Sequence, residues 1–196
     1  MRTLSVREQL LEHTLVLVRQ RGFNGFSYRD LAEHVGVKTS SIHYYFPTKE
    51  DLVQAAVTEY SARICDHVRH IDTALPPEEQ AREFLKPWLD SADGDRVCLV
   101  GMLSTEALLL PEPVHRVLKE FYRVNESWLT RLLESAQATQ RKPAVLAPQT
   151  MAQAVLGALQ NGLVVARLFG APQRIKAAAD LLTVAVSGTV AEPVPA

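Results

Sequence analysis

Residues 27–49 carry the clearest local pattern in the chain and read SYRDLAEHVGVKTSSIHYYFPTK. Apolar positions at helical spacing predict a short helix over residues 30–35 and a second over residues 39–46, and Gly36 between them allows the chain to reverse. Two short helices joined by a tight turn are typical of a helix-turn-helix. The outward face of the second helix bears side chains that can hydrogen-bond to base edges and phosphates in a DNA major groove, namely Thr39, Ser40, His43 and Tyr44.

Helices are also predicted on both sides of this pattern. Ser5 begins a capping-box sequence, and the apolar face that follows it ends near Gly22. Pro47 prevents the second short helix from continuing smoothly, and Thr48 caps a new long helix that runs until Pro76. We therefore expect three helices to close a small core and the fourth to connect it to the rest of the chain.

The remainder is predicted to be helical as well. Apolar residues at helical spacing, separated by breaks that contain proline or glycine, predict helices over residues 78–89, 97–110, 114–138, 149–169 and 173–190. Because we find no strand pattern and no internal repeat, the fold class is expected to be all-α.

Composition argues against several classes of protein. The 196 residues are 47% hydrophobic, enough to bury a sizeable core, and a net charge of −1 argues against a protein that coats nucleic acid by bulk electrostatics. Any contact with DNA must therefore come from a local patch of defined geometry. The histidines lack metal-ligand spacing with carboxylates, and no serine or cysteine has an evident base partner, so we expect no metal site, no cofactor and no enzyme activity.

The two cysteines and the apolar segments indicate where the protein resides. Cys65 and Cys98 lie in unlike surroundings without metal-ligand spacing, which fits a reducing compartment. No apolar run follows the basic residue at the N-terminus, and the most apolar later stretch, residues 151–169, is interrupted by polar residues. We therefore expect a cytoplasmic protein without a signal peptide or membrane span.

The last two predicted helices are unusually apolar. A helix that is apolar on more than one face leaves hydrophobic surface after its own core is formed, and a second copy of the chain can cover that surface. The residues predicted to form such a dimer interface are Leu156, Leu159, Leu163, Leu181 and Leu182.

Three polar residues interrupt apolar stripes in the second part of the chain, namely Glu106, Asn125 and Gln160. A buried polar group needs a partner, so each of them either makes a structural hydrogen bond, which is the better expectation for any single one, or faces a ligand. Taken with nearby aromatic and methionine residues, they predict a mostly apolar pocket for a small amphipathic or aromatic molecule. The other predicted pocket residues are Trp88, Met102, Phe121, Tyr122 and Trp128.

A helix, a helix-turn-helix, the string IHYYFPTKEDL at residues 42–52 and an all-helical remainder resemble the TetR family of one-component bacterial repressors. The resemblance is specific over residues 10–52 and architectural beyond them. It implies a homodimer that places two recognition helices in successive major grooves of a palindromic operator, with a small-molecule effector bound in the larger domain. We accordingly predict a DNA-binding domain over residues 1–50, a ligand-binding and dimerisation domain over residues 51–190, and a flexible tail over residues 191–196.

The resemblance also implies which residues face DNA. These positions correspond to Tyr28, Arg29, Thr39, Ser40, Ser41, His43, Tyr44 and Tyr45, and Lys49 matches the phosphate-binding lysine of the family. Tyrosine hydroxyls and a lysine at a helix start suit phosphate oxygens, and Arg29 suits a guanine edge. The family usually has a small hydroxyl residue at the position of Lys38, so either the helix cap shifts to Thr39 or Lys38 itself binds a phosphate.

Alternatives to a ligand-responsive repressor also follow from the sequence. An activator, a ligand-independent repressor and a helix-turn-helix that binds protein instead of DNA are the first three. The fourth is a thiol-based electrophile or redox sensor: Cys98 lies near a predicted helix start after Arg96, and both features favour a thiolate. The more common role of a lone cysteine is that of a small buried apolar residue, which is also what we expect of Cys65.

Overall fold

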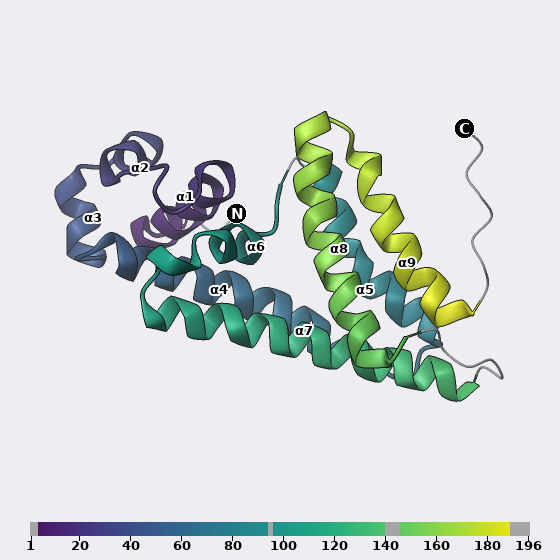
Figure 1. Ribbon diagram of the computed structural model, residues 1–196. Helices are drawn as coiled ribbons and strands as arrows, with labels where there is room; N and C mark the ends of the chain where they lie inside the picture. The colour runs from purple at the N-terminus through teal and green to yellow at the C-terminus, as the bar shows by residue number, and fades with distance from the viewer. Residues whose placement is uncertain (1–3, 94–95, 140–145, 189–196) are drawn as a thin grey trace. The chain divides into compact units, whose positions relative to one another are not determined.

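The computed structural model describes residues 4–93, 96–139 and 146–188, and all of its regular structure in these ranges is helical, without a strand (Figure 1). The predicted all-α class is confirmed. The chain divides into two compact units. The first combines Met1–Ile64 with Cys98–Phe121, and the second combines Cys65–Val97 with Tyr122–Ala196, so that two long helices contribute to both. The domain boundary expected at residue 50 stays a prediction. The expected tail over residues 191–196 lies outside the described residues and stays a prediction as well.

The first unit contains the helix-turn-helix. Its elements are α1 (Val6–Arg21), α2 (Tyr28–Val35), α3 (Thr39–Tyr45), most of α4 (Lys49–Arg69), α6 (Leu99–Thr105), a 3₁₀ turn η1 (Ala107–Leu109) and the start of α7 (Glu112–Thr139). Helix α1 packs against both α2 and α6, and α2 packs against α3. The predicted helix over residues 97–110 is thus shorter than expected, because the chain leaves helical geometry at Glu106 and continues as the 3₁₀ turn.

Local signals in the sequence explain where these helices begin and end. The Ser5 and Ser27 side chains each complete a capping box with an acid three residues later, so the first backbone amides of α1 and α2 are satisfied. Gly22 ends α1 and Gly36 ends α2, both at positive φ, a conformation that suits glycine. These caps fix the lengths of both helices.

The core of the first unit gathers the apolar faces of α1 to α4 and α6. Its most deeply buried side chains include Leu10, Leu31, Ile42, Leu52 and Leu103. Phe23 and Phe26, in the turn between α1 and α2, are also buried and close this core. The recognition helix is held mainly by Ile42, which is fully buried.

The second unit is a helical bundle. It contains the end of α4, α5 (Pro77–Asp93), the larger part of α7, α8 (Pro148–Phe169), a 3₁₀ turn η2 (Pro172–Ile175) and α9 (Lys176–Ser187). Helices α5, α8 and α9 pack against one another, and α8 and α9 lie side by side in Figure 1. The Phe84 ring of α5 stacks on Trp128 of α7 with centroids 5.1 Å apart. Helix α8 passes close to η2 at Gly162, where a Cβ would lie in van der Waals contact with Ile175, at 3.4 Å.

Burial corrects the predicted dimer interface. Four of its five leucines have 0–3% of their surface exposed and pack inside the second unit, namely Leu156, Leu159, Leu163 and Leu182. They cannot contact a second copy, because the chain's own core already covers them. Only Leu181 is partly exposed. The apolar side chains that α8 leaves in solvent are instead Val164, Leu168 and Phe169.

Helix α8 is long and apolar enough to cross a membrane when judged by length and composition alone, with a mean hydropathy of 1.2. Buried residues make up 39% of its most apolar window. A core helix of a bundle passes the same test, so this property does not separate the two possibilities.

Candidate DNA-binding interface

The recognition helix α3 presents one continuous polar face. It begins at Thr39, with Lys38 as the N-cap residue in extended conformation and without a side-chain capping bond. Of the two alternatives for this position, the shift of the cap to Thr39 is therefore wrong. Thr39, Ser40, His43 and Tyr44 are exposed and recur at helical spacing, so they lie on the same face. Ser41, also predicted to face DNA, is half-buried beside them.

The two tyrosines at the end of α3 differ in exposure. Tyr44 is 82% exposed and Tyr45 39% exposed, and their rings meet edge to face with centroids 5.1 Å apart. Neither hydroxyl has a hydrogen-bond partner among the residues that the structure describes. Each hydroxyl is thus available to a phosphate oxygen, and the ring contact orients the more exposed Tyr44.

Tyr28 is engaged inside the domain. Its hydroxyl donates to the carbonyl oxygen of Phe46 at 2.8 Å and to that of Thr48, on either side of the break between α3 and α4. Burial, and then the carboxylates of Asp51 and Glu50, raise the pKa of Tyr28 to about 12. The Tyr28 ring also meets His43 edge to face at 4.8 Å. Tyr28 therefore fixes the end of the recognition helix, and a phosphate contact by the same hydroxyl stays a prediction.

Lys49 is likewise turned inward. Its ammonium group donates to the Phe26 carbonyl and lies over two aromatic rings, 4.9 Å from the centroid of Phe23 and 4.3 Å from that of Phe26. Partial burial lowers the pKa of Lys49, while the negative charges of Glu50, Glu106 and Asp30 act to raise it. The residue that the resemblance assigns to phosphate binding is thus part of the packing between the α1–α2 turn and the start of α4.

Arg29 and Lys38 remain at the surface. Arg29 forms an ion pair with Glu33 one turn along α2, with its Nε 3.3 Å from the carboxylate and 87% of its side chain exposed. Such an exposed pair contributes little to stability, so Arg29 can exchange its partner for a base or phosphate. Lys38 has an exposed side chain.

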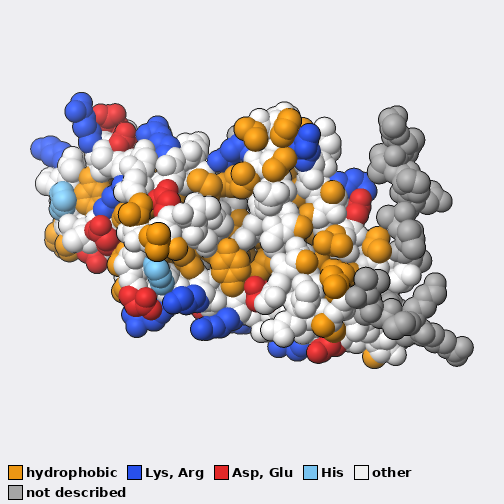
Figure 2. All heavy atoms as spheres, in the orientation of Figure 1, with side chains coloured by type: hydrophobic (Ala, Val, Ile, Leu, Met, Phe, Trp, Pro, Cys, Tyr) orange, Lys and Arg blue, Asp and Glu red, His pale blue; other side chains and the backbone are white. Residues whose placement is uncertain are grey.

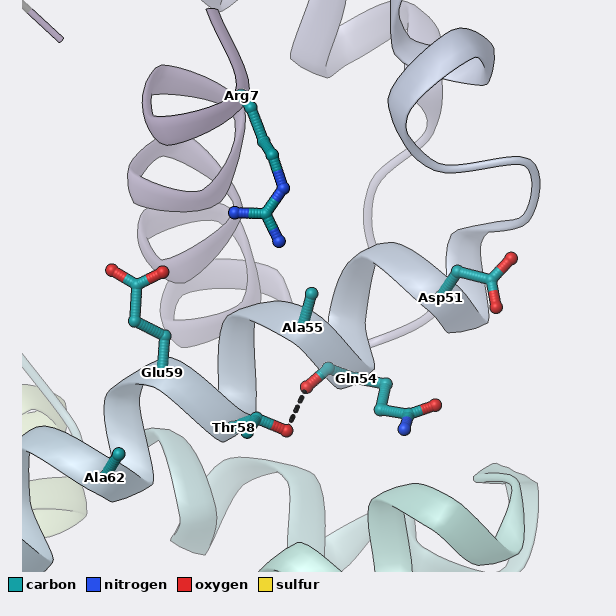
Figure 3. A pocket seen from close by; sticks show the side chains of 7 residues that line it. All are labelled: Arg7, Asp51, Gln54, Ala55, Thr58, Glu59 and Ala62. Carbon is teal, nitrogen blue, oxygen red and sulfur yellow. Dashed lines mark hydrogen bonds between the residues drawn. The ribbon is translucent and has the colours of Figure 1, made fainter. Parts of the chain in front are cut away.

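Arg7 is a candidate that sequence reasoning missed. It lies in the first turn of α1, and its guanidinium covers the ring of Phe46, the residue that ends α3, at 5.5 Å. Figure 3 shows it facing an open groove of about 460 Å³ along α4. The pattern of residues on α3 gives no signal for Arg7, because Arg7 lies on α1, 32 positions before Thr39, the first residue of α3. The other residues that line the groove are Asp51, Gln54, Ala55, Thr58, Glu59 and Ala62.

The predicted pocket residues are divided between the two units. Met102, Glu106 and Phe121 belong to the first unit, and Glu106 accepts a hydrogen bond from the backbone N–H of Phe23. For Glu106 the structure therefore favours a structural role over a ligand contact. The remaining five, in the second unit, are Trp88, Tyr122, Asn125, Trp128 and Gln160.

Inside the second unit these five residues are largely used by the bundle itself. The Tyr122 hydroxyl donates to Gln160 Oε1 at 2.9 Å, Asn125 is completely buried, and Trp128 stacks on Phe84. A smaller cavity of about 170 Å³ exists in this unit, but none of the eight predicted pocket residues lines it. Its walls come from the end of α5, the end of α8 and η2, and include Ala92, Arg96, Leu163, Ala166 and Arg167.

The surroundings of Cys98 favour the more common role of a buried apolar residue over the alternative of a reactive thiolate. This residue is the N-cap of α6, but it is 5% exposed, and burial raises the pKa of the thiol. The Tyr60 hydroxyl, 4.0 Å away, and the charge of Arg19 act in the opposite direction without outweighing burial. The effect of burial thus outweighs the favourable position at a helix start, and Cys98, like Cys65, is a buried cysteine outside any disulfide. Among the described residues, no cluster of histidine, cysteine and acidic side chains could hold a metal ion.

Comparison with known proteins places this geometry in context. Residues 10–56 match the family described as "Bacterial regulatory proteins, tetR family", and residues 77–182 match "Tetracyclin repressor-like, C-terminal domain". The uncharacterised transcriptional regulator YxaF of Bacillus subtilis is 26% identical over 65% of this chain and 69% of its own length. The transcriptional repressor DhaR of Mycobacterium sp. strain GP1 is 23% identical over 81% and 80%. A TetR transcriptional regulator from Legionella pneumophila has a similar structure, with a TM-score of 0.82, 26% identity and coverage of 93% and 97%.

Tyr28→Phe and Tyr44→Phe should separate structural from DNA-facing hydroxyls. Tyr28→Phe removes the bonds to Phe46 and Thr48 and should lower the free energy of unfolding by about 1 kcal/mol, measured by urea denaturation. Tyr44→Phe should leave stability unchanged and weaken DNA binding. Because the pKa of Tyr28 rises from 10.0 to about 12 on folding, the stabilisation that its hydroxyl gives the folded protein should be complete below pH 10 and should be lost as pH rises to about 12. Equal stability of the two variants would contradict this division.

The buried thiols should be unreactive in the folded protein. Because the pKa of Cys98 is raised, a smaller fraction of it is thiolate at neutral pH than in an ordinary cysteine. Cys65 is also buried, so a disulfide reagent should react rapidly with neither residue until urea exposes both. The measurement is the absorbance of the released reagent anion at pH 7 with and without denaturant. Rapid reaction of one thiol per folded chain, abolished by Cys98→Ser, would restore the sensor hypothesis.

Proposed function

Since the chain belongs to the TetR family of transcriptional regulators and carries its helix-turn-helix DNA-binding domain, we propose that it is a repressor that binds a palindromic operator as a homodimer and is released by a small-molecule effector. The observation that carries the proposal is the exposed polar face of α3, whose opposite face is anchored by the fully buried Ile42. A face without apolar residues other than an exposed tyrosine suits a hydrogen-bonding partner.

The proposed contacts divide into base edges and phosphates. Thr39, Ser40 and His43 read base edges in the major groove, while the hydroxyl of Tyr44 and the charges of Arg29 and Lys38 hold phosphates. Because the net charge of the chain is −1, these few contacts supply the attraction that overall charge does not. The relative DhaR is named as a repressor, which supports repression over activation.

Exposed apolar residues support the homodimer. Along α8 a stripe of small and apolar side chains reaches solvent at helical spacing and ends in Val164 and Leu168. Figure 2 shows hydrophobic side chains gathered over this end of α8. On the neighbouring α9, Leu181 and Val184 are partly exposed. A patch spread over two adjacent helices suits a self-complementary interface, and two-fold symmetry of the protein matches a palindromic site.

The effector is proposed to be small and partly apolar. Polar residues beside aromatic rings in the second unit, the buried Asn125 and the half-buried Tyr122–Gln160 pair, orient such a molecule by exchanging their contacts within the bundle for contacts with it. Tryptophan and tyrosine supply apolar surface together with a polar group, which suits an amphipathic or aromatic ligand. The raised pKa of Cys98 argues against the alternative of release by thiol-reactive compounds. We propose that the protein acts in the cytoplasm, as TetR-family regulators generally do.

Selection from a pool of randomised DNA duplexes should yield a palindrome. The selected operator should bind by fluorescence anisotropy with an affinity that falls as salt rises, with a slope of about −0.9 in log–log form for each phosphate contacted. His43→Ala should weaken operator binding much more than binding to an unrelated duplex. Recovery of no palindrome, or binding independent of salt, would instead favour a protein-interaction module.

Two leucine variants should test the dimer surface. Leu168→Glu introduces a charge into the exposed stripe of α8 and should weaken self-association at least tenfold, measured by sedimentation equilibrium, and operator binding with it. Leu109→Glu makes the same change at an exposed position of η1 and is the matched control. Dimerisation that is unaffected by Leu168→Glu would place the interface elsewhere.

A further inference from the structure

The turn between α1 and α2 is held by a side chain from a distant part of the sequence. The Glu106 carboxylate, at the residue that ends α6, accepts the backbone N–H of Phe23 at 2.9 Å through one oxygen and at 3.2 Å through the other. Eighty-three positions separate the two residues. Because Phe23 follows the end of α1, its amide lacks a helical partner, and the carboxylate satisfies it.

The turn is shaped to receive this carboxylate. Gly22 has a φ of 76°, which already favours glycine, and a Cβ at Gly22 would lie 2.0 Å from Glu106 Oε1. The carboxylate thus occupies the space that any other residue would fill. The positive φ therefore favours glycine, and a larger residue would have to push the end of the flexible Glu106 side chain aside and so disturb its contact with Phe23.

The same turn contacts the start of α4, which follows the recognition helix α3. The rings of Phe23 and Phe26 cover the ammonium group of Lys49, the first residue of α4, and Phe26 also accepts its hydrogen bond. The negative charge of Glu106 favours the charged form of Lys49. Only the cap Phe46, Pro47 and Thr48 lie between α3 and Lys49, so a change at Phe23 reaches the end of the recognition helix through one layer of side chains.

We propose that Glu106 is a positioning residue for DNA recognition. Its carboxylate holds the α1–α2 turn, the turn holds Lys49, and Lys49 sets where α3 ends and α4 begins. The inference rests on the proposed function and deepens it, because it names a contact away from DNA on which the placement of the DNA-binding interface depends: loss of the carboxylate frees the Phe23 amide and loosens the recognition helix. Glu106, which the sequence assigned to a ligand pocket, acts on DNA binding without touching DNA.

The test compares three variants with the wild-type protein. Glu106→Ala removes both acceptor oxygens, Glu106→Gln keeps one acceptor of the same shape, and Glu112→Ala removes an exposed carboxylate at the start of α7 as a control with the same change of charge as Glu106→Ala. Measurements are hydrogen exchange at the Phe23 amide, and affinity for the selected operator and for an unrelated duplex. Thermal unfolding identifies any variant that is generally destabilised.

Glu106→Ala should accelerate exchange at Phe23 at least tenfold and weaken operator binding about tenfold, while binding to the unrelated duplex changes less than twofold. Specificity falls in that case because loose placement of α3 harms base contacts more than phosphate contacts. Glu106→Gln should lie between wild type and Glu106→Ala, and Glu112→Ala should match wild type. If Glu106→Ala fails to fold, Glu106→Gln decides the question through the same two readouts.

Operator affinity within twofold of wild type in Glu106→Ala, or equal losses on both duplexes, would overturn the positioning role. Unchanged exchange at Phe23 would overturn it as well, because the contact would then be absent in solution. Failure of the proposed function looks different, because the wild-type protein would then select no operator. In that case faster exchange at the Phe23 amide in Glu106→Ala would report only a structural contact. The role of Glu106 in DNA recognition would then fall together with the proposed function.

Discussion

A single hydroxyl group joins the two helices on which DNA recognition depends. Pro47 separates α3 from α4, because proline has no backbone N–H and cannot extend the preceding helix. Tyr28, from α2, donates to the carbonyls of Phe46 and Thr48 on both sides of that break. The angle between α3 and α4 is therefore set by a residue of the helix that comes before both.

This arrangement divides the helix-turn-helix residues into two groups. Tyr28 and Lys49 face inward, where the first joins α3 to α4 and the second packs α4 against the α1–α2 turn. Thr39, Ser40, His43 and Tyr44 face outward. Inward residues make the outward face rigid, and rigidity lowers the conformational cost of binding. A residue type suited to DNA is thus not sufficient evidence that the residue touches DNA.

Short-range patterns predicted the fold well. The capping box at Ser5 and the glycines that end α1 and α2 follow from neighbouring residues, and the structure bears them out. Helix α8 shows where such patterns fail. It is apolar on several faces, so periodicity could not decide which leucines the bundle buries, and the expected interface leucines proved to be core. Cys98 and Glu106 depend on burial and on a partner 83 residues away, which no local pattern contains.

Helix α3 has seven residues, far fewer than the roughly 12–15 that an isolated helix needs to persist in water. It exists because Ile42 and the groups at its two ends tie it to the domain, and His43 adds a contact with the Tyr28 ring and with the Pro47 carbonyl. The outward residues Thr39, Ser40 and Tyr44 contribute little to that anchoring, so mutations at these three positions are nearly neutral for folding. Under the proposed function, descendants of this protein can acquire new operator preferences after gene duplication by changes at these three sites, without first having to gain stability elsewhere.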